Sequence, residues 1–125
     1  MSSSELRYLI ATQELGTINS SVKQMAIASK LKVSKVSVYN AIERLKEKGY
    51  VIKDERNVML TPLGIKILNE YETIIKFIEG HFVVHCSIPK DIAHNDALEA
   101  TCSLSDLTRE NILKFIGGMN NEGRI

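Results

Sequence analysis

The sequence predicts a mostly α-helical protein that carries one small β-hairpin. Along most of the chain apolar residues recur three and four positions apart, as on the inner face of amphipathic helices. Two short apolar runs between residues 50 and 60 flank a polar turn, which is typical of a hairpin. Residues that commonly begin or end helices interrupt the helical spacing at Ser34, Gly49 and Thr61-Pro62.

The first two helices are short. One is expected from about Ser4 to Leu15, with Gly16 after it, and the second from Val22 to Leu31. Asn19-Ser20-Ser21 offers an N-cap for the second helix, and Ser21 with Gln24 has capping-box spacing. Its inward positions are expected to be Val22, Met25, Ala26 and Leu31.

A third helix should follow a tight link, Lys32-Val33-Ser34, in which Val33 points inward and Ser34 caps the new helix. Val38, Ile42 and Leu45 have helical spacing, and Gly49 suits the C-terminal end. The hairpin comes next. It consists of residues 50–53, a polar tip at residues 54–57, and residues 58–60.

Thr61-Pro62 is the clearest helix start, because a capping residue precedes proline at the first helical position. One apolar stripe follows over five turns: Leu63, Ile67, Leu68, Tyr71, Ile74, Ile75, Ile78 and Phe82. So long a stripe needs a second helix to cover it, often one from another subunit. After a break at residues 87–89, two helices are expected at about 89–101 and 106–116, the latter capped by Ser105.

This order of elements predicts a winged helix-turn-helix over residues 1–62, followed by a helical dimerisation segment over 63–118 and a flexible tail over 119–125. In such a unit the second helix braces the third, whose first half enters the DNA major groove. Asn40 is the best candidate for base readout, because an amide pairs bidentately with adenine. The candidate DNA-contacting residues are Lys32, Ser34, Lys35, Val36, Ser37, Tyr39, Asn40, Arg44, Lys53 and Arg56, with Lys46 a further phosphate contact.

Positive charge is concentrated in the segment that is predicted to bind DNA. Residues 22–56 hold nine basic and four acidic residues, a balance of +5, whereas the remainder holds seven basic and eleven acidic residues, a balance of −4. A basic segment on an otherwise acidic chain indicates a local anionic partner, here double-stranded DNA.

Composition excludes several other classes. No apolar run approaches the roughly 20 residues of a membrane span, and Met1 to Glu5 has no signal-peptide character. Two cysteines, Cys86 and Cys102, are too few for a disulfide framework, so a cytoplasmic protein with free thiols is expected. Glycine-rich phosphate loops and metalloprotease motifs are missing from the sequence, so we expect no enzyme.

Residues 26–34, with Val38, Leu45 and 60–64, resemble many bacterial winged-helix regulators. The stretch from Ile92 to Ser105 resembles the segment after the long linker helix in the iron- and manganese-dependent repressors, the family of the diphtheria toxin repressor and the manganese transport regulator. The resemblance implies a homodimer, built from the long helix and the last two helices, that binds a palindromic operator as a repressor.

The sequence departs from that family at the metal ligands. The ligand positions of the first helix fall on Ser4 and Arg7, and the histidine of the long helix falls on Lys76. The positions after the linker fall on Leu98, Thr101 and Cys102, of which only the cysteine could bind a metal. Metal control is therefore expected to be weakened or lost, with no cofactor required.

A different site for a divalent transition metal is a second hypothesis. Its candidate ligands are His81, His85, His94 and Cys102, whose imidazole and thiolate groups suit zinc. The alternative is that His81 and His85 complement the dipole at a helix end, that His94 is a surface residue, and that the cysteines are small core residues.

Three other functions stay open at this stage. They are a ligand-responsive regulator of the multiple-antibiotic-resistance type, a winged-helix module that binds a protein, and a thiol-based redox sensor.

Overall fold

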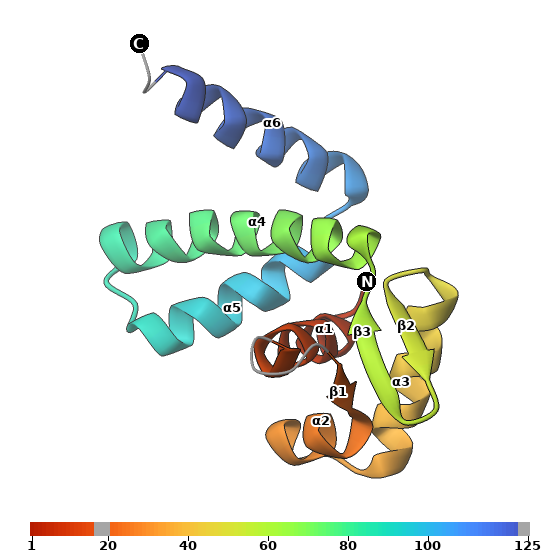
Figure 1. Cartoon of the computed structure of the whole chain (residues 1–125). Helices are drawn as coiled ribbons and strands as arrows, with labels where there is room; N and C mark the ends of the chain where they lie inside the picture. Colours follow the sequence, from red (N-terminus) through yellow and green to blue (C-terminus); the bar gives the residue numbers. More distant parts are fainter. Residues whose placement is uncertain (17–20, 123–125) are drawn as a thin grey trace. The chain divides into compact units, whose positions relative to one another are not determined.

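The computed structural model describes residues 1–16 and 21–122, with side chains up to residue 119. The chain forms two compact units, Met1–Leu68 and Asn69–Ile125, which we treat separately. The elements, labelled in Figure 1, are α1 (Ser3–Gly16), β1 (Val22–Lys23), α2 (Gln24–Leu31), α3 (Lys35–Glu47), β2 (Val51–Asp54), β3 (Asn57–Leu60), α4 (Pro62–Cys86), α5 (Lys90–Ser103) and α6 (Asp106–Glu122). The predicted mostly helical architecture with one hairpin is confirmed.

The core of the first unit lies between its three helices and the sheet. Its side chains come from α1, α2, α3 and β3 and have almost no exposed surface. Burying a leucine or isoleucine side chain contributes roughly 1.5–3 kcal/mol, so this cluster is the main source of stability for the unit. The members are Leu6 and Leu9 from α1, Ile27 from α2, Val38, Ile42 and Leu45 from α3, and Val58 from β3.

A capping box that the sequence analysis missed starts α1. The Ser2 hydroxyl accepts a hydrogen bond from the Glu5 amide at 3.1 Å, and the Glu5 carboxylate accepts one from the Ser2 amide at 3.2 Å. Serine followed three residues later by glutamate is the sequence signal for this motif, and it was available in Ser2-Ser3-Ser4-Glu5.

The expected start of the second helix at Val22 is wrong. Val22 and Lys23 form strand β1, which pairs antiparallel with β3 so that Val22 lies opposite Val58. The helix begins at Gln24, whose amide donates to the Arg56 carbonyl at 3.0 Å, and no side chain caps it. Pairing with β3 therefore replaces the expected capping box of Ser21 and Gln24, while Asn19 and Ser20 lie outside the described residues.

The later start also changes which side chains face inward. Ile27 and Ala28 are buried, whereas Met25 is 56% exposed and Val33 is 38% exposed, so the expected inward orientation of these two residues is wrong. Ala26 and Leu31, also expected inward, are half-buried.

The third helix and the hairpin form as predicted. Ser34 caps α3, and Gly49 follows its end with a φ of 81°, a conformation that favours glycine. In the hairpin β2 pairs with β3 from Val51 opposite Leu60 to Asp54 opposite Asn57, so the turn has only two residues, Glu55 and Arg56. With β1 added, the sheet has the strand order β1-β3-β2.

The second unit contains most of α4, with α5 and α6. Tyr71, Ile74 and Ile75 of the predicted stripe are buried, as are Ala93 and Ala97 of α5. Arg109 of α6 lies over the Tyr71 ring at 5.1 Å and donates to the Thr101 carbonyl at 3.4 Å, which ties the three helices together.

Three details of α4 and α6 can be compared with the sequence-based expectation. Leu63, at the start of the stripe, is 45% exposed rather than buried. Ser105 caps α6 as predicted, accepting from the Thr108 amide at 3.2 Å. The helix then continues through Gly117 and Gly118 to Glu122 instead of ending near Ile116, and residues 123–125 lie outside the described part. In that described part, no helix has the length and apolar character that crossing a bilayer requires.

Candidate nucleic-acid interface

The first turns of α3 present a row of accessible side chains. The Ser34 hydroxyl accepts from the Ser37 amide at 3.1 Å and donates to the Ser37 hydroxyl at 2.9 Å, which fixes the start of the helix. Val36 is 68% exposed and Tyr39 is 50% exposed. Lys35, Ser37 and Asn40 are exposed as well, so every predicted reading residue on this helix is accessible.

The opposite face of α3 anchors it. Val38, Ala41, Ile42 and Leu45 have no exposed surface. Small and branched side chains allow two helices to approach closely, and Ile27 of α2 is buried with them. The exposed face is therefore carried by a helix that cannot rotate without opening the core.

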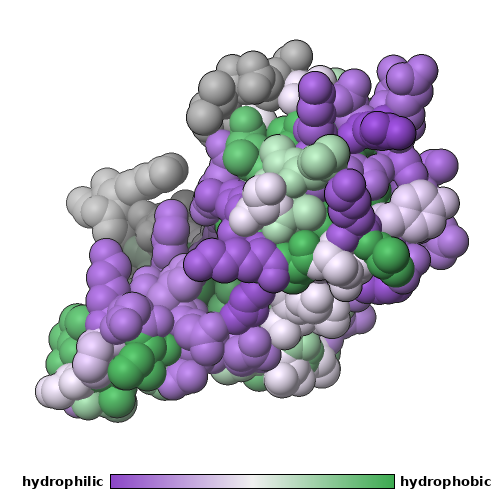
Figure 2. All heavy atoms as spheres, turned by 90° about the horizontal axis from the view of Figure 1, so that it is seen from below, coloured by the Kyte–Doolittle hydropathy of each residue, from purple (hydrophilic) through white to green (hydrophobic). Residues whose placement is uncertain are grey.

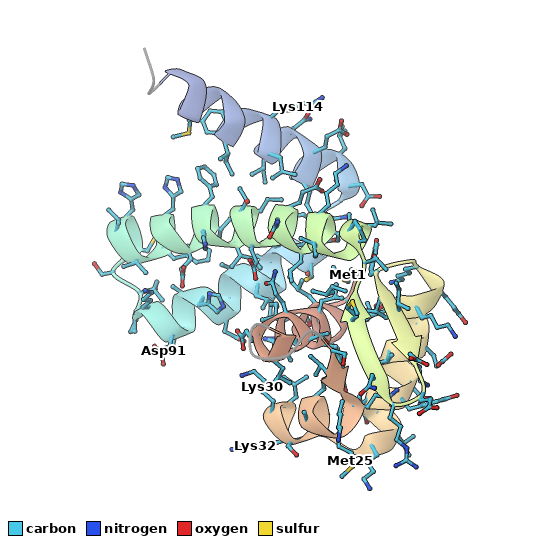
Figure 3. The ribbon with its side chains drawn as sticks, in the orientation of Figure 1. Met1, Met25, Lys30, Lys32, Asp91 and Lys114 are labelled. Carbon is cyan, nitrogen blue, oxygen red and sulfur yellow. The ribbon has the colours of Figure 1, made fainter. Side chains whose placement is uncertain are left out.

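A tight turn joins α2 to α3. Lys32 adopts the left-handed conformation with a φ of 55°, and its amide bonds to the Ala28 carbonyl. The Val33 amide donates to the same carbonyl at 3.1 Å. Lys32 is exposed, and Figure 3 shows it at the end of α2 opposite to Met25. The predicted link is confirmed, although Lys32 is a non-glycine residue in a conformation that usually favours glycine.

The hairpin brings a second set of cations close to α3. Lys53 Nζ lies 3.0 Å from Glu43 Oε1 and 4.1 Å from the centre of the Tyr39 ring. The hydrogen bond from Lys53 lowers the pKa of Glu43 below its ordinary value. Arg56 is exposed in the two-residue turn. Of the two hairpin cations predicted to contact phosphate, Lys53 is thus already paired and Arg56 is accessible.

An open groove of about 900 Å³ runs between α2, α3 and the hairpin. Four of its lining side chains are cationic, and one is a carboxylate, Glu55. Such a concave, positively charged surface concentrates anions such as the phosphates of a nucleic acid. The lining residues are Lys23, Gln24, Met25, Lys35, Val38, Tyr39, Lys53, Glu55, Arg56 and Asn57.

The polar lining residues that were missed as candidate site residues are Lys23, Gln24, Glu55 and Asn57. Reading Val22–Leu31 as one helix gave no reason to place Lys23 beside the hairpin. The pairing of β1 with β3 does so, because it sets Lys23 opposite Asn57.

Figure 2 views the molecule from below, the side on which α2 and the tip of the hairpin lie in Figure 1. Hydrophilic side chains cover most of this view, with hydrophobic ones gathered in several places among them. Arg44 and Lys46, further along α3, are exposed too. This mixture of cations and apolar groups is typical of surfaces that contact both phosphates and base edges.

The candidate metal ligands of the second unit do not converge. His81 and His85 stack with ring centres 5.3 Å apart, and His94 Nδ1 lies 3.3 Å from a carboxylate oxygen of Glu79. Cys102 is half-buried on α5, and neither it nor Cys86 forms a disulfide. Within the described residues, no three histidine, cysteine or acidic side chains come together as a metal site. The predicted four-residue set is therefore not assembled.

The ligand positions implied by the family resemblance do not fit a metal either. Leu98 is 4% exposed and Thr101 is fully buried, with its hydroxyl donating to the Ala97 carbonyl at 2.7 Å. The Leu98 side chain is packed in the core and the Thr101 hydroxyl is already hydrogen-bonded, so neither residue supplies an anionic metal ligand. Lys76 is an exposed cation and Arg7 a half-buried one. None of these four side chains offers the carboxylate, imidazole or thiolate that a metal site uses.

Comparison with known proteins supports the architecture. A family profile described as an HTH domain matches residues 18–66. A hypothetical protein from Sulfolobus solfataricus superposes with a TM-score of 0.76 at 24% identity, over 94% of this chain and 91% of that one. The fold is a winged helix-turn-helix.

Two further solved structures are similar to this chain. The manganese regulator SloR superposes with a TM-score of 0.72 at 24% identity, and IdeR of T. acidophilum with a TM-score of 0.64 at 19% identity. Each comparison covers 90% of this chain but 53% of the other, so the chain spans about half the length of these two proteins. No curated protein matches the sequence.

Proposed function

We propose that this protein is a sequence-specific regulator of transcription that binds double-stranded DNA as a homodimer and acts as a repressor. The observation that carries the proposal is the accessible first half of α3 beside a groove with four cationic side chains. Helix, turn, helix and hairpin in this order suit insertion of the third helix into a major groove about 12 Å wide.

The residues of the interface divide into two roles. Asn40 reads a base, because its amide can pair with adenine, and the exposed Val36 meets the methyl group of thymine. Lys32, Arg44 and Arg56 contact phosphates, which fixes the position of the protein without reading sequence. Lys35, Ser37 and Tyr39 can contact either bases or phosphates.

Fluorescence anisotropy tests the assignment with two duplexes, the promoter fragment of the protein's own gene and a random sequence. Asn40→Ala should lower the preference for the promoter by roughly 1–3 kcal/mol and leave binding to random DNA unchanged. Arg56→Gln is the matched control, since loss of a phosphate contact should weaken binding to both duplexes alike and reduce the salt slope by about one. Equal affinity of Asn40→Ala and wild type on both duplexes would refute the readout role.

We propose further that DNA binding does not depend on a metal. Among the ligand positions implied by the family resemblance, Arg7 and Lys76 repel a cation and Leu98 has no donor atom. Affinity for the promoter should therefore be the same with added Mn²⁺, with added Zn²⁺ and with a chelator at fixed salt. Binding that requires either metal would instead point to ligands built from the histidines of α4 and Cys102.

A second candidate function is recognition of a protein partner. Exposed apolar side chains on the same unit favour it, because Met25 and Ile52 are each 56% exposed. The two functions differ in salt dependence, since neutralisation of phosphates gives a steep slope of affinity against salt. The absence of any salt-dependent affinity for DNA would move the protein-binding function to first place.

A further inference from the structure

The ammonium group of Lys53 is held on two sides by side chains of α3. Lys53 faces this helix because Val51, two residues earlier in β2, is buried while Ile52 between them is exposed. Its Nζ atom lies 3.0 Å from Glu43 Oε1 and 4.1 Å above the ring of Tyr39. Tyr39 and Glu43 are four residues apart and so share one side of α3.

This arrangement resembles the way a lysine meets a phosphate. A carboxylate, like a phosphate, offers charged oxygens that accept hydrogen bonds from an ammonium group. Lys53 lines the same groove as Lys23, Lys35 and Arg56, and only 15% of its side chain is exposed. A cation of the proposed DNA interface is therefore already satisfied within the free protein.

We propose that Glu43 takes the place of a DNA phosphate in the free protein, where it holds Lys53 and the hairpin against α3, and that it gives Lys53 up to a phosphate when DNA binds. The proposal rests on the DNA-binding function argued above. It makes Glu43 a positioning residue that sets the affinity of the interface without contacting DNA.

The Glu43–Lys53 pair is expected to weaken DNA binding. Breaking the pair opposes binding, so Glu43 lowers affinity for DNA of any sequence, because phosphate contacts carry no sequence information. The hydrogen bond from Lys53 lowers the pKa of Glu43, so the carboxylate stays charged at neutral pH and the competition persists there. The exchange replaces one oxyanion by another, so Lys53, whose side chain is 15% exposed, keeps a charged acceptor when a phosphate takes the place of the carboxylate.

The test compares wild type, three single variants and two double variants on a random-sequence duplex and on the promoter fragment over a series of salt concentrations. Glu43→Gln should tighten binding to both duplexes about two- to fivefold. Glu47→Gln is the matched control, because it removes the same charge from an exposed position one turn further along α3. Lys53→Gln should weaken binding and reduce the salt slope by about one. In a Lys53→Gln background, the gain of Glu43→Gln over Glu47→Gln should vanish.

Three results would overturn the proposal. A gain no larger than that of Glu47→Gln would mean that Glu43 acts only as one more negative charge. A gain that survives in the Lys53→Gln background would mean that the pair is irrelevant. If Glu43→Gln bound the promoter fragment more weakly and the random-sequence duplex unchanged, Glu43 would instead accept a hydrogen bond from a cytosine of the promoter. Thermal unfolding checks that each variant is folded, and a wild-type protein without affinity for either duplex would instead remove the DNA-binding function itself.

Discussion

Glu5 is a buried carboxylate whose three partners compensate for its loss of water. It is 7% exposed, and it receives hydrogen bonds from the Ser2 amide at 3.2 Å, from the Ser2 hydroxyl at 3.0 Å and from Lys48 Nζ at 2.8 Å. Burial raises the pKa of Glu5, but the hydrogen bonds from Lys48 and Ser2 outweigh it, so the pKa lies below the ordinary value of 4.5. Lys48 follows α3 directly, so this one side chain joins the start of α1 to the end of α3.

Glu5→Gln should destabilise the protein by roughly 1 kcal/mol at neutral pH, since it loses a charge-assisted hydrogen bond. Because the folded pKa is depressed, the contribution is fully present above pH 4.5 and disappears as the pH falls through the lower folded pKa. Urea unfolding at neutral and acidic pH should therefore show the two proteins converging in acid. Glu14→Gln is the control, because its pair with Lys30 is 55% exposed at the carboxylate and should matter little.

Gly64 tolerates no side chain. A Cβ atom there would lie 2.0 Å from the Tyr50 carbonyl oxygen, which already accepts from the Thr61 amide at 3.0 Å. Gly64→Ala should cost roughly 1–3 kcal/mol, because backbone must move. At Gly80, in the same helix, a Cβ meets nothing within 4 Å, and Gly80→Ala should add about 0.5–1 kcal/mol. Equal thermal stability of the two variants would contradict this account.

At the scale of elements, α3 depends on its N-cap residue, Ser34, as much as on its core. The Ser34 side chain accepts a hydrogen bond from the Ser37 amide, one of the donors left without a backbone partner at a helix start. The same turn carries Lys35 and Val36 to the surface, so the cap also positions the proposed reading residues.

Ser34→Ala should destabilise the protein by about 1 kcal/mol, because the N-cap acceptor is lost. Ser34→Asn should restore most of that stability, since an amide oxygen also caps helices well. The free energy of unfolding in urea distinguishes the three proteins. A Ser34→Ala protein as stable as wild type would show that the core alone fixes the start of α3.

At the scale of the whole molecule, the second unit leaves several apolar side chains uncovered. Val84 of α4 is 73% exposed, and Phe115 and Met119 of α6 are 59% and 49% exposed. Phe115 also meets the Phe77 ring edge-on at 6.1 Å, so its contact with its own unit is partial. Such side chains favour a second copy of the chain as the partner that covers them.

Phe115→Glu should therefore weaken self-association at least about tenfold, because aromatic residues are among the strongest contributors to interfaces. Sedimentation velocity at micromolar concentration measures the effect. Lys114→Glu is the matched control, since it changes the charge of the neighbouring residue on α6 without removing apolar surface. A wild-type protein that sediments as a monomer would exclude the proposed homodimer.

Local sequence signals predicted most of this fold. Ser34, Gly49, Thr61-Pro62 and Ser105 each begin or end a helix where the sequence analysis expected, because caps depend on contacts within four residues. The helical spacing of Val38, Ile42 and Leu45 likewise identified buried positions. The predicted DNA-contacting residues of α3 then followed, because they are the positions of this helix that do not belong to the buried face.

Other features were decided by residues far apart in the chain. Val22 and Lys23 became a strand because β3, more than thirty residues later, supplies backbone partners that outweigh local helix preference. For the same reason Lys23 reached the groove and Met25 turned outward. His81, His85, His94 and Cys102 are close in sequence, yet the packing of α4 and α5 gives His94 a carboxylate partner and leaves the set unassembled.

The sequence by itself determined the order of helices and hairpin, the caps and the buried stripe of α3, because each depends on residues within one or two helical turns. Only the tertiary structure decided the third strand, the composition of the groove and the pairing of Lys53 with Glu43. These depend on which backbone edges and side chains meet across the fold, and the energy of such contacts has no signature in the local sequence.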